Sequence, residues 1–155
     1  MKKSQIRKKF LKLRENKLKK VKSINHNDII KLLKKKGIKG KIVGGYYPYN
    51  NELDCIQILK KLEKKNYFIS LPKIKKNFQM DFIQWSSKEP LVINKFGIPE
   101  PSNGKIKFPD ILLIPLLSFD TKLNRVGYGG GFYDRYIQRI KRKKKPLLVG
   151  LAYSF

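Results

Sequence analysis

The chain has 155 residues, 41% hydrophobic and 12% aromatic, with a formal net charge of +26 at pH 7. This size and apolar content predict one folded domain and exclude an intrinsically disordered protein. No apolar run approaches the roughly 20 residues that span a bilayer, and none follows the basic start, so we expect neither a membrane helix nor a signal peptide. The single cysteine, Cys55, cannot form an internal disulfide, which favours a cytoplasmic protein with Cys55 in the core.

The N-terminal half alternates helices with short apolar runs. A basic helix is predicted over residues 3–20 and a second helix over 28–36. A strand over 42–47 follows them. The next helix is expected over 52–64, where Asn51 is the expected cap and the apolar positions recur at helical spacing.

The remainder of the chain continues the alternation. Further strands are expected over 67–71, 80–85, 111–117 and 147–152. The run 111–117 is the most apolar and is expected at the centre of the sheet, and 147–152 also has the character of a buried strand. Residues 86–109 show little periodicity and are interpreted mostly as an ordered loop, and a last helix covers 133–140. This order predicts an α/β fold: a layered α/β/α domain with a largely parallel central sheet in an open, Rossmann-like arrangement.

A glycine-rich segment joins the central strand to the last helix. It runs from Arg125 to Asp134 and has four glycines within residues 127–131. A strand, a glycine-rich loop and a helix N-terminus commonly hold phosphate through free backbone N–H groups. Phe132 and Tyr133 stand where a P-loop has Lys and Ser/Thr, so neither that motif nor the dinucleotide fingerprint is present. Arg125 places a cation at one end of the segment and Asp134 a carboxylate at the other. The segment therefore predicts a site that binds the phosphates of a nucleotide together with a metal ion. The simpler alternative is a turn that only links strand to helix.

The positive charge gives a second, weaker indication. It would attract nucleic acid, yet lysines are scattered over every segment and outnumber arginines. Nucleic-acid-binding proteins more often gather arginine on one face. We therefore expect no nucleic-acid partner, and a non-catalytic, basic nucleic-acid-binding protein remains an alternative.

Taken together, the motifs resemble those of the 5-formyltetrahydrofolate cyclo-ligase (methenyltetrahydrofolate synthetase) family. The central signature is the apolar run Pro109–Asp120 followed by Asn124–Arg135. Three further elements occur in the family's order: Lys3-Ser-Gln-Ile-Arg7, Tyr47-Pro-Tyr-Asn-Asn-Glu52 and Phe96-Gly-Ile-Pro-Glu-Pro101. The resemblance covers nearly the whole chain, so we expect residues 1–155 to form a single cyclo-ligase domain. Family members continue beyond the position of Phe155, so we also expect the chain to lack their C-terminal segment, its aspartate near the metal and one edge strand.

The resemblance implies an ATP-dependent ring closure. In the family, ATP phosphorylates the formyl oxygen of 5-formyltetrahydrofolate, N10 attacks the activated carbon, and phosphate leaves. The products are 5,10-methenyltetrahydrofolate, ADP and phosphate, and Mg²⁺ assists. The implied substrate includes polyglutamylated folate, and the expected state is a monomer. A different phosphate- or nucleotide-binding enzyme with the same loop remains the alternative.

The resemblance also implies which residues hold the nucleotide. The expected ATP-binding residues are Lys3, Arg7, Arg125, Gly127, Tyr128, Gly129, Gly130, Gly131, Phe132 and Tyr133. Arg125 and Tyr133 are the expected catalytic residues among them. The family often has a basic residue where this chain has Tyr128 or Gly130, so that phosphate cation is expected either to be missing or to be supplied by Lys122 or Arg135.

Asp134 is the expected Mg²⁺ ligand, and Asp120 is ranked below it as a turn carboxylate. A simpler role for Asp134 is to complement the dipole of the helix that it begins. For the folate, Glu52 would pair with the donor-rich edge of the pterin, and Tyr47 and Phe96 would offer flat apolar surface.

Overall fold

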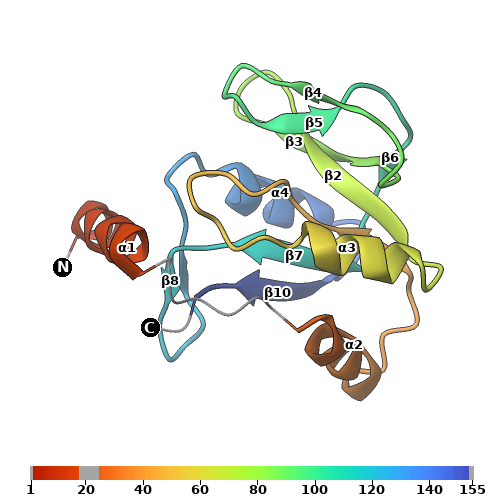
Figure 1. Cartoon of the computed structure of the whole chain (residues 1–155), viewed down its shortest axis with the longest axis horizontal. Coiled ribbons are helices and arrows are strands. Elements are labelled where there is room, and N and C mark those ends of the chain that lie inside the picture. Colours follow the sequence, from red (N-terminus) through yellow and green to blue (C-terminus); the bar gives the residue numbers. More distant parts are fainter. Residues whose placement is uncertain (1, 18–24, 154–155) are drawn as a thin grey trace.

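The computed structural model describes residues 2–17 and 25–153 (Figure 1). Its six-stranded sheet has the order β10-β7-β1-β2-β3-β6. These strands are β1 (Ile42–Gly44), β2 (Phe68–Ile74), β3 (Met80–Gln84), β6 (Ile106–Lys107), β7 (Ile111–Pro115) and β10 (Leu147–Leu151). The first four in sheet order run parallel, whereas β3 and β6 are antiparallel to their neighbours. The predicted α/β fold with a largely parallel sheet is confirmed.

Helices cover both faces of this sheet (Figure 1). Helices α2 (His26–Lys35) and α3 (Ile56–Glu63) pack on one face, and α4 (Phe132–Ile140) packs on the other. Successive residues of β7 alternate between the two cores: Ile111 and Leu113 face α3, and Leu112 and Ile114 face α4. This explains why the whole strand is buried and reads as a continuous apolar run.

Smaller elements surround the layers. Helix α1 (Lys3–Lys17) lies outside them and contacts β9 (Arg125–Val126), which pairs with β8 (Ser118–Phe119). A second hairpin joins β4 (Leu91–Ile93) to β5 (Pro99–Pro101). None of the described helices is long and apolar enough to cross a membrane.

Two expectations at the N-terminal side need correction, and a third is tested only in part. The predicted helix 52–64 begins only at Ile56, because Asn50 and Asn51 adopt left-handed φ values of 46° and 57° and the side chain of Asp54 accepts the Ile56 N–H instead. The strand expected over 42–47 ends at Gly44. The helix expected over 3–20 is present to Lys17, and its last three residues lie outside the described ranges.

Three further expectations change around the sheet. Strand β2 continues through Pro72 to Ile74, although it was expected to end at residue 71. Its pairing with β1 stops at Ser70, so the missing N–H of Pro72 leaves no hydrogen bond unmade on that side. The loop expected over 86–109 contains β4, β5 and β6. Strand β10 is an edge of the described sheet with alternating burial, and so it is not a fully buried strand.

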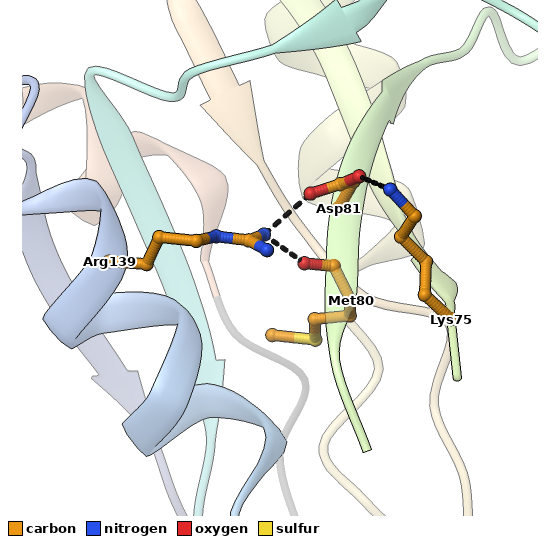
Figure 2. A network of polar contacts seen from close by, with 4 residues as sticks. All are labelled: Lys75, Met80, Asp81 and Arg139. Carbon is orange, nitrogen blue, oxygen red and sulfur yellow. Dashed lines mark hydrogen bonds and ion pairs between the residues drawn. The ribbon is translucent and has the colours of Figure 1, made fainter. Parts of the chain in front are cut away.

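One ion pair fixes α4 to the sheet, and a second joins the same carboxylate to Lys75 after β2, as Figure 2 shows. Asp81 of β3 is 9% exposed and accepts hydrogen bonds from Arg139 of α4 at 2.5 Å and from Lys75 at 2.6 Å. The Arg139 guanidinium also donates to the backbone carbonyl of Met80. Because α4 begins directly after the glycine-rich segment, this network also sets the position of that segment.

Candidate active site

A cavity of about 380 Å³ opens where β1, β2 and β7 end. The chain leaves β1 toward β2 on one side, whereas β7 and β10 lie on the other side. Parallel sheets bind ligands at such a switch point, in the crevice beyond the carboxyl ends of the strands. Tyr46 and Tyr47 after β1, Pro72 of β2 and Pro115 of β7 contribute to the lining.

The glycine-rich segment forms one wall of this cavity. Gly129 and Gly131 have φ values of +108° and +68°, which other residues adopt only with strain. A Cβ on Gly129 would also lie 3.4 Å from Cζ of Arg7. Gly131 precedes α4 as its N-cap and has no side chain to cap the helix. The first N–H groups of α4 are therefore available to an anion in the cavity.

Three cations line the same wall: Lys3, Arg7 and Arg125. Lys3 and Arg7 lie one turn apart on α1, and Nε of Arg7 donates to the Gly127 carbonyl oxygen at 2.9 Å. The Arg125 guanidinium lies 5.8 Å from the centre of the Tyr133 ring. This wall combines positive charge with backbone donors, which suits a polyphosphate.

Asp134 is the carboxylate of this wall. It forms an ion pair with Arg125, and its side chain remains 69% exposed. No group of three or more His, Cys, Asp or Glu side chains among the described residues is placed to hold a metal ion. Mg²⁺ commonly binds through one or two carboxylates plus substrate phosphates, so a lone carboxylate beside a phosphate site fits Mg²⁺ but not a metal caged by protein ligands.

Another part of the lining forms an aromatic wall. Tyr47 and Phe96 line the cavity and are 36% and 38% exposed. Phe96 contacts the Phe132 ring edge-on with centroids 5.9 Å apart, and Asn94 holds the Phe96 turn by accepting the Phe96 N–H at 2.9 Å. Flat apolar rings that face an open cavity suit a planar ligand.

Glu52 lies at the inner end of the aromatic wall. Its Oε2 accepts the Tyr49 N–H at 3.0 Å, in a tight turn four residues before α3. It was expected in the first turn of that helix, but it lies before the helix begins. Burial raises the pKa of the Glu52 carboxyl to about 7, although the Tyr49 hydrogen bond and the charge of Arg14 lower it. The carboxyl therefore changes charge near neutral pH.

The Tyr133 hydroxyl is buried and has no hydrogen-bond partner within the part of the chain that the structure describes. Burial raises the pKa of Tyr133 well above its ordinary value, so the phenol stays protonated at neutral pH. Tyr133 also lines the cavity. A neutral phenol here can donate a hydrogen bond, but it cannot act as a base.

Comparisons with known proteins agree with this arrangement. The sequence model of the 5-formyltetrahydrofolate cyclo-ligase family matches residues 1–155. The chain belongs to this family. A relative from Haemophilus influenzae, named 5-formyltetrahydrofolate cyclo-ligase, is 36% identical over 117 residues, which cover 70% of this chain and 62% of the relative. A Mycoplasma genitalium relative of the same name is 34% identical over 111 residues, covering 71% of this chain and 58% of the relative. The chain thus spans about three-fifths of the length of these relatives.

Solved structures of the family share the fold. The structure of 5,10-methenyltetrahydrofolate synthetase from Aquifex aeolicus superposes with a TM-score of 0.75 at 30% identity, over 99% of this chain and 79% of that one. The synthetase from Mycoplasma pneumoniae gives a TM-score of 0.64 at 23% identity, over 93% of this chain and 82% of that one, and shows the fold alone.

The structure of this cyclo-ligase family member brings most of the site residues that we predicted from the sequence to one cavity. The lining includes Lys3, Arg7, Tyr47, Glu52, Phe96, Arg125, Gly127, Tyr128, Gly129, Gly130, Gly131, Phe132, Tyr133 and Asp134. Asp120 is not in the lining and holds the β8–β9 turn through the Asn124 N–H at 2.8 Å. Lys122 and Arg135 are also absent from the lining, and Arg135 donates to the carbonyls of Gly130 and Phe78 instead.

Other residues of the site escaped prediction. Tyr46 and Tyr49 line the cavity, and the dense aromatic run from Tyr46 to Tyr49 was the available signal. Arg14 and Tyr153 lie beside Tyr128 and Glu52. They come from opposite ends of the chain, so no local pattern indicated them. Cys55 is buried in the core, as predicted, and Trp85 is buried there as well.

Proposed function

We propose that this chain catalyses the ATP-dependent cyclisation of 5-formyltetrahydrofolate to 5,10-methenyltetrahydrofolate, with release of ADP and phosphate. One observation carries the proposal. A glycine-rich segment with three cations and a group of aromatic side chains with a carboxyl line a single cavity. Such a space holds a nucleotide's terminal phosphate beside a planar substrate, which a phosphoryl transfer between them requires.

The glycine-rich wall would hold ATP. Backbone N–H groups of Gly129 to Phe132 and the start of α4 would bind phosphate oxygens, and Lys3, Arg7 and Arg125 would neutralise their charge. Asp134 would hold Mg²⁺, which would supply further positive charge at the phosphates. Phosphoryl transfer asks the protein mainly for positioning and charge stabilisation, so no nucleophilic side chain is needed.

The aromatic wall would hold the folate. The pterin would lie against Tyr47 and Phe96, and the ionised Glu52 carboxylate would accept hydrogen bonds from its N–H donors. The formyl oxygen is a poor leaving group until it is phosphorylated. Arg125 would stabilise the transferring phosphoryl group, and the neutral Tyr133 hydroxyl would donate a hydrogen bond to an oxygen in the cavity.

We further propose that the chain acts as a monomer in the cytoplasm and accepts polyglutamylated folate. The lysine-rich surface favours the anionic glutamate tail electrostatically.

Turnover tests the proposal. The protein, 5-formyltetrahydrofolate and Mg-ATP are mixed, and the near-ultraviolet absorbance of the methenyl product is followed. Substrate labelled with ¹⁸O in the formyl group is expected to transfer the label to the released phosphate. Asp134→Asn is expected to lower turnover at least about 100-fold with little loss of stability, because an exposed ion pair contributes at most about 1 kcal/mol.

Asp28→Asn, an exposed acid on α2, serves as the control and should turn over normally. Absence of turnover in the folded wild-type protein would remove the cyclo-ligase proposal. Nucleotide hydrolysis without folate dependence would favour another nucleotide enzyme, and salt-sensitive binding of random duplex DNA would favour the nucleic-acid alternative.

A further inference from the structure

Helix α1 is attached to the rest of the molecule in an unusual way. The only buried residue of this 15-residue helix is a charged one, Arg14, which is 2% exposed. Its apolar stripe of Ile6, Phe10 and Leu13 is only partly buried. A helix normally docks through an apolar face, so the placement of α1 depends on the contacts of its arginines.

Those contacts lead directly to the cavity wall. Arg14 donates from Nη1 to the Tyr128 hydroxyl in the glycine-rich segment, and from Nη2 to the Leu116 carbonyl at 3.0 Å, just after β7. Its guanidinium lies 5.9 Å from the centre of the Tyr128 ring and 5.0 Å from that of Tyr153. Together with the bond from Arg7 to Gly127, two points of α1 clamp the first residues of the segment.

The charge of Arg14 has no ion-pair partner within 4 Å among the described residues. A buried cation needs compensation, and the carboxyl that interacts with it electrostatically is Glu52. The other titratable groups that interact with Glu52 come from several elements: Tyr46, Cys55, Tyr128, Tyr133 and Tyr153. Burial raises the pKa of each of these phenols and of the Cys55 thiol, so all are neutral near pH 7 and Arg14 is the cation that acts on Glu52.

We propose that Arg14 is a positioning residue that holds Tyr128 of the glycine-rich segment against α1, and that its buried charge acts on Glu52, whose backbone carbonyl accepts a hydrogen bond from the Tyr153 hydroxyl beside the Arg14 guanidinium. Arg14 thereby affects both walls. Its guanidinium orders the glycine-rich wall through the hydrogen bond to Tyr128, and its charge acts electrostatically on Glu52 in the aromatic wall. The functional consequence rests on the proposed cyclo-ligase activity, but both physical effects can be measured without it.

Three variants separate the two effects. Arg14→Gln removes both the positive charge and the guanidinium group that makes two hydrogen bonds. Arg14→Lys keeps the charge but cannot make both hydrogen bonds, and Tyr128→Phe removes only the hydroxyl that accepts one of them. Glu52 titration is followed by ¹³C NMR of its carboxyl, and amide hydrogen exchange is followed in residues 127–131. Arg142→Gln, an exposed arginine outside the site, is the matched control.

Removal of the charge in Arg14→Gln is expected to raise the Glu52 pKa by about 1 unit, while Arg14→Lys and Tyr128→Phe leave it within a few tenths. All three are expected to speed exchange in residues 127–131 about 10-fold or more, whereas Arg142→Gln changes neither signal. If the wild type is active, the pKa that defines the acid side of its kcat/KM–pH profile should rise by the same amount in Arg14→Gln.

An unchanged Glu52 titration in folded Arg14→Gln, or unchanged exchange in Arg14→Lys and Tyr128→Phe, would overturn the proposal. Should Arg14→Gln fail to fold, the exchange measured on the two milder variants still decides the clamp. A raised Glu52 pKa in Arg14→Lys, despite its retained charge, would contradict the electrostatic part. Absence of turnover in the wild type would remove the cyclo-ligase proposal and leave the NMR and exchange results standing.

Discussion

Single residues in this site have environments that would be unfavourable in an ordinary core. Burial destabilises the ionised form of the Glu52 carboxyl. The Tyr133 hydroxyl is buried without a hydrogen-bond partner among the described residues. Such groups destabilise a fold unless a ligand satisfies them. At this scale, the site is prepared for a partner that brings hydrogen-bond donors to Glu52 and an acceptor to Tyr133.

Replacing Glu52 should increase the stability of the fold and decrease the affinity for folate. The folded pKa of about 7 exceeds the ordinary 4.5, so the folded state binds more protons between these values and stability falls as pH rises through them. Glu52→Gln should remove that fall and raise the free energy of unfolding at pH 8 by about 1–2 kcal/mol, after discounting for the partial exposure of the side chain. Folate affinity should drop at least about 10-fold.

Urea denaturation at pH 5 and pH 8 measures this effect, with Glu15→Gln on the exposed face of α1 as the control. A Glu52→Gln variant that is no more stable than the wild type at pH 8 would show that the carboxyl is not desolvated in the folded protein.

Among the elements, the glycine-rich segment and α4 act as one unit that the sheet holds in place. Gly129 needs its φ of +108°, and α4 is fixed to β3 through Asp81 (Figure 2). The segment is therefore shaped by its glycines from within and positioned from outside by ion pairs and by α1.

Gly129→Ala should weaken nucleotide binding by about 10-fold or more, because the new Cβ strains the backbone and approaches Arg7. Gly37→Ala is the matched control: Gly37 also has a positive φ, +61°, but nothing lies within 4 Å of a Cβ built there. Both variants should lose about 1 kcal/mol or more of stability, and only Gly129→Ala should lose affinity in isothermal titration calorimetry with ATP. Equal affinity in the two variants would argue against a phosphate-binding role for the segment.

Asp81→Ala should destabilise the protein by about 2–3 kcal/mol, because it leaves Arg139 without its buried carboxylate. Lys75→Met should cost under about 1 kcal/mol, since the Lys75 side chain is 55% exposed. Chemical denaturation of the two variants measures the difference. Similar losses in both would mean that the Arg139 contact does not anchor α4.

At the scale of the whole molecule, much of the architecture was predictable because local signals agreed with the global fold. The apolar run at β7 and the alternation of helices and strands indicated a parallel sheet, and the glycines indicated the segment that lines the cavity. What escaped prediction depends on distant contacts. The late start of α3 follows from two asparagines with left-handed φ values. Strand β2 can continue through Pro72 because its pairing with β1 has already ended. Arg14 is buried by contacts with a segment more than a hundred residues away in the sequence.

The central claim is that one cavity holds a nucleotide phosphate against the glycine-rich segment and a pterin against Tyr47 and Phe96. A structure of the protein with Mg-ADP and 5-formyltetrahydrofolate tests it most directly. We predict phosphate oxygens within hydrogen-bond distance of the backbone N–H groups of residues 129–132, and the pterin edge on the Glu52 carboxylate. Nucleotide bound on the lysine-rich outer surface, with this cavity filled only by water, would contradict the account.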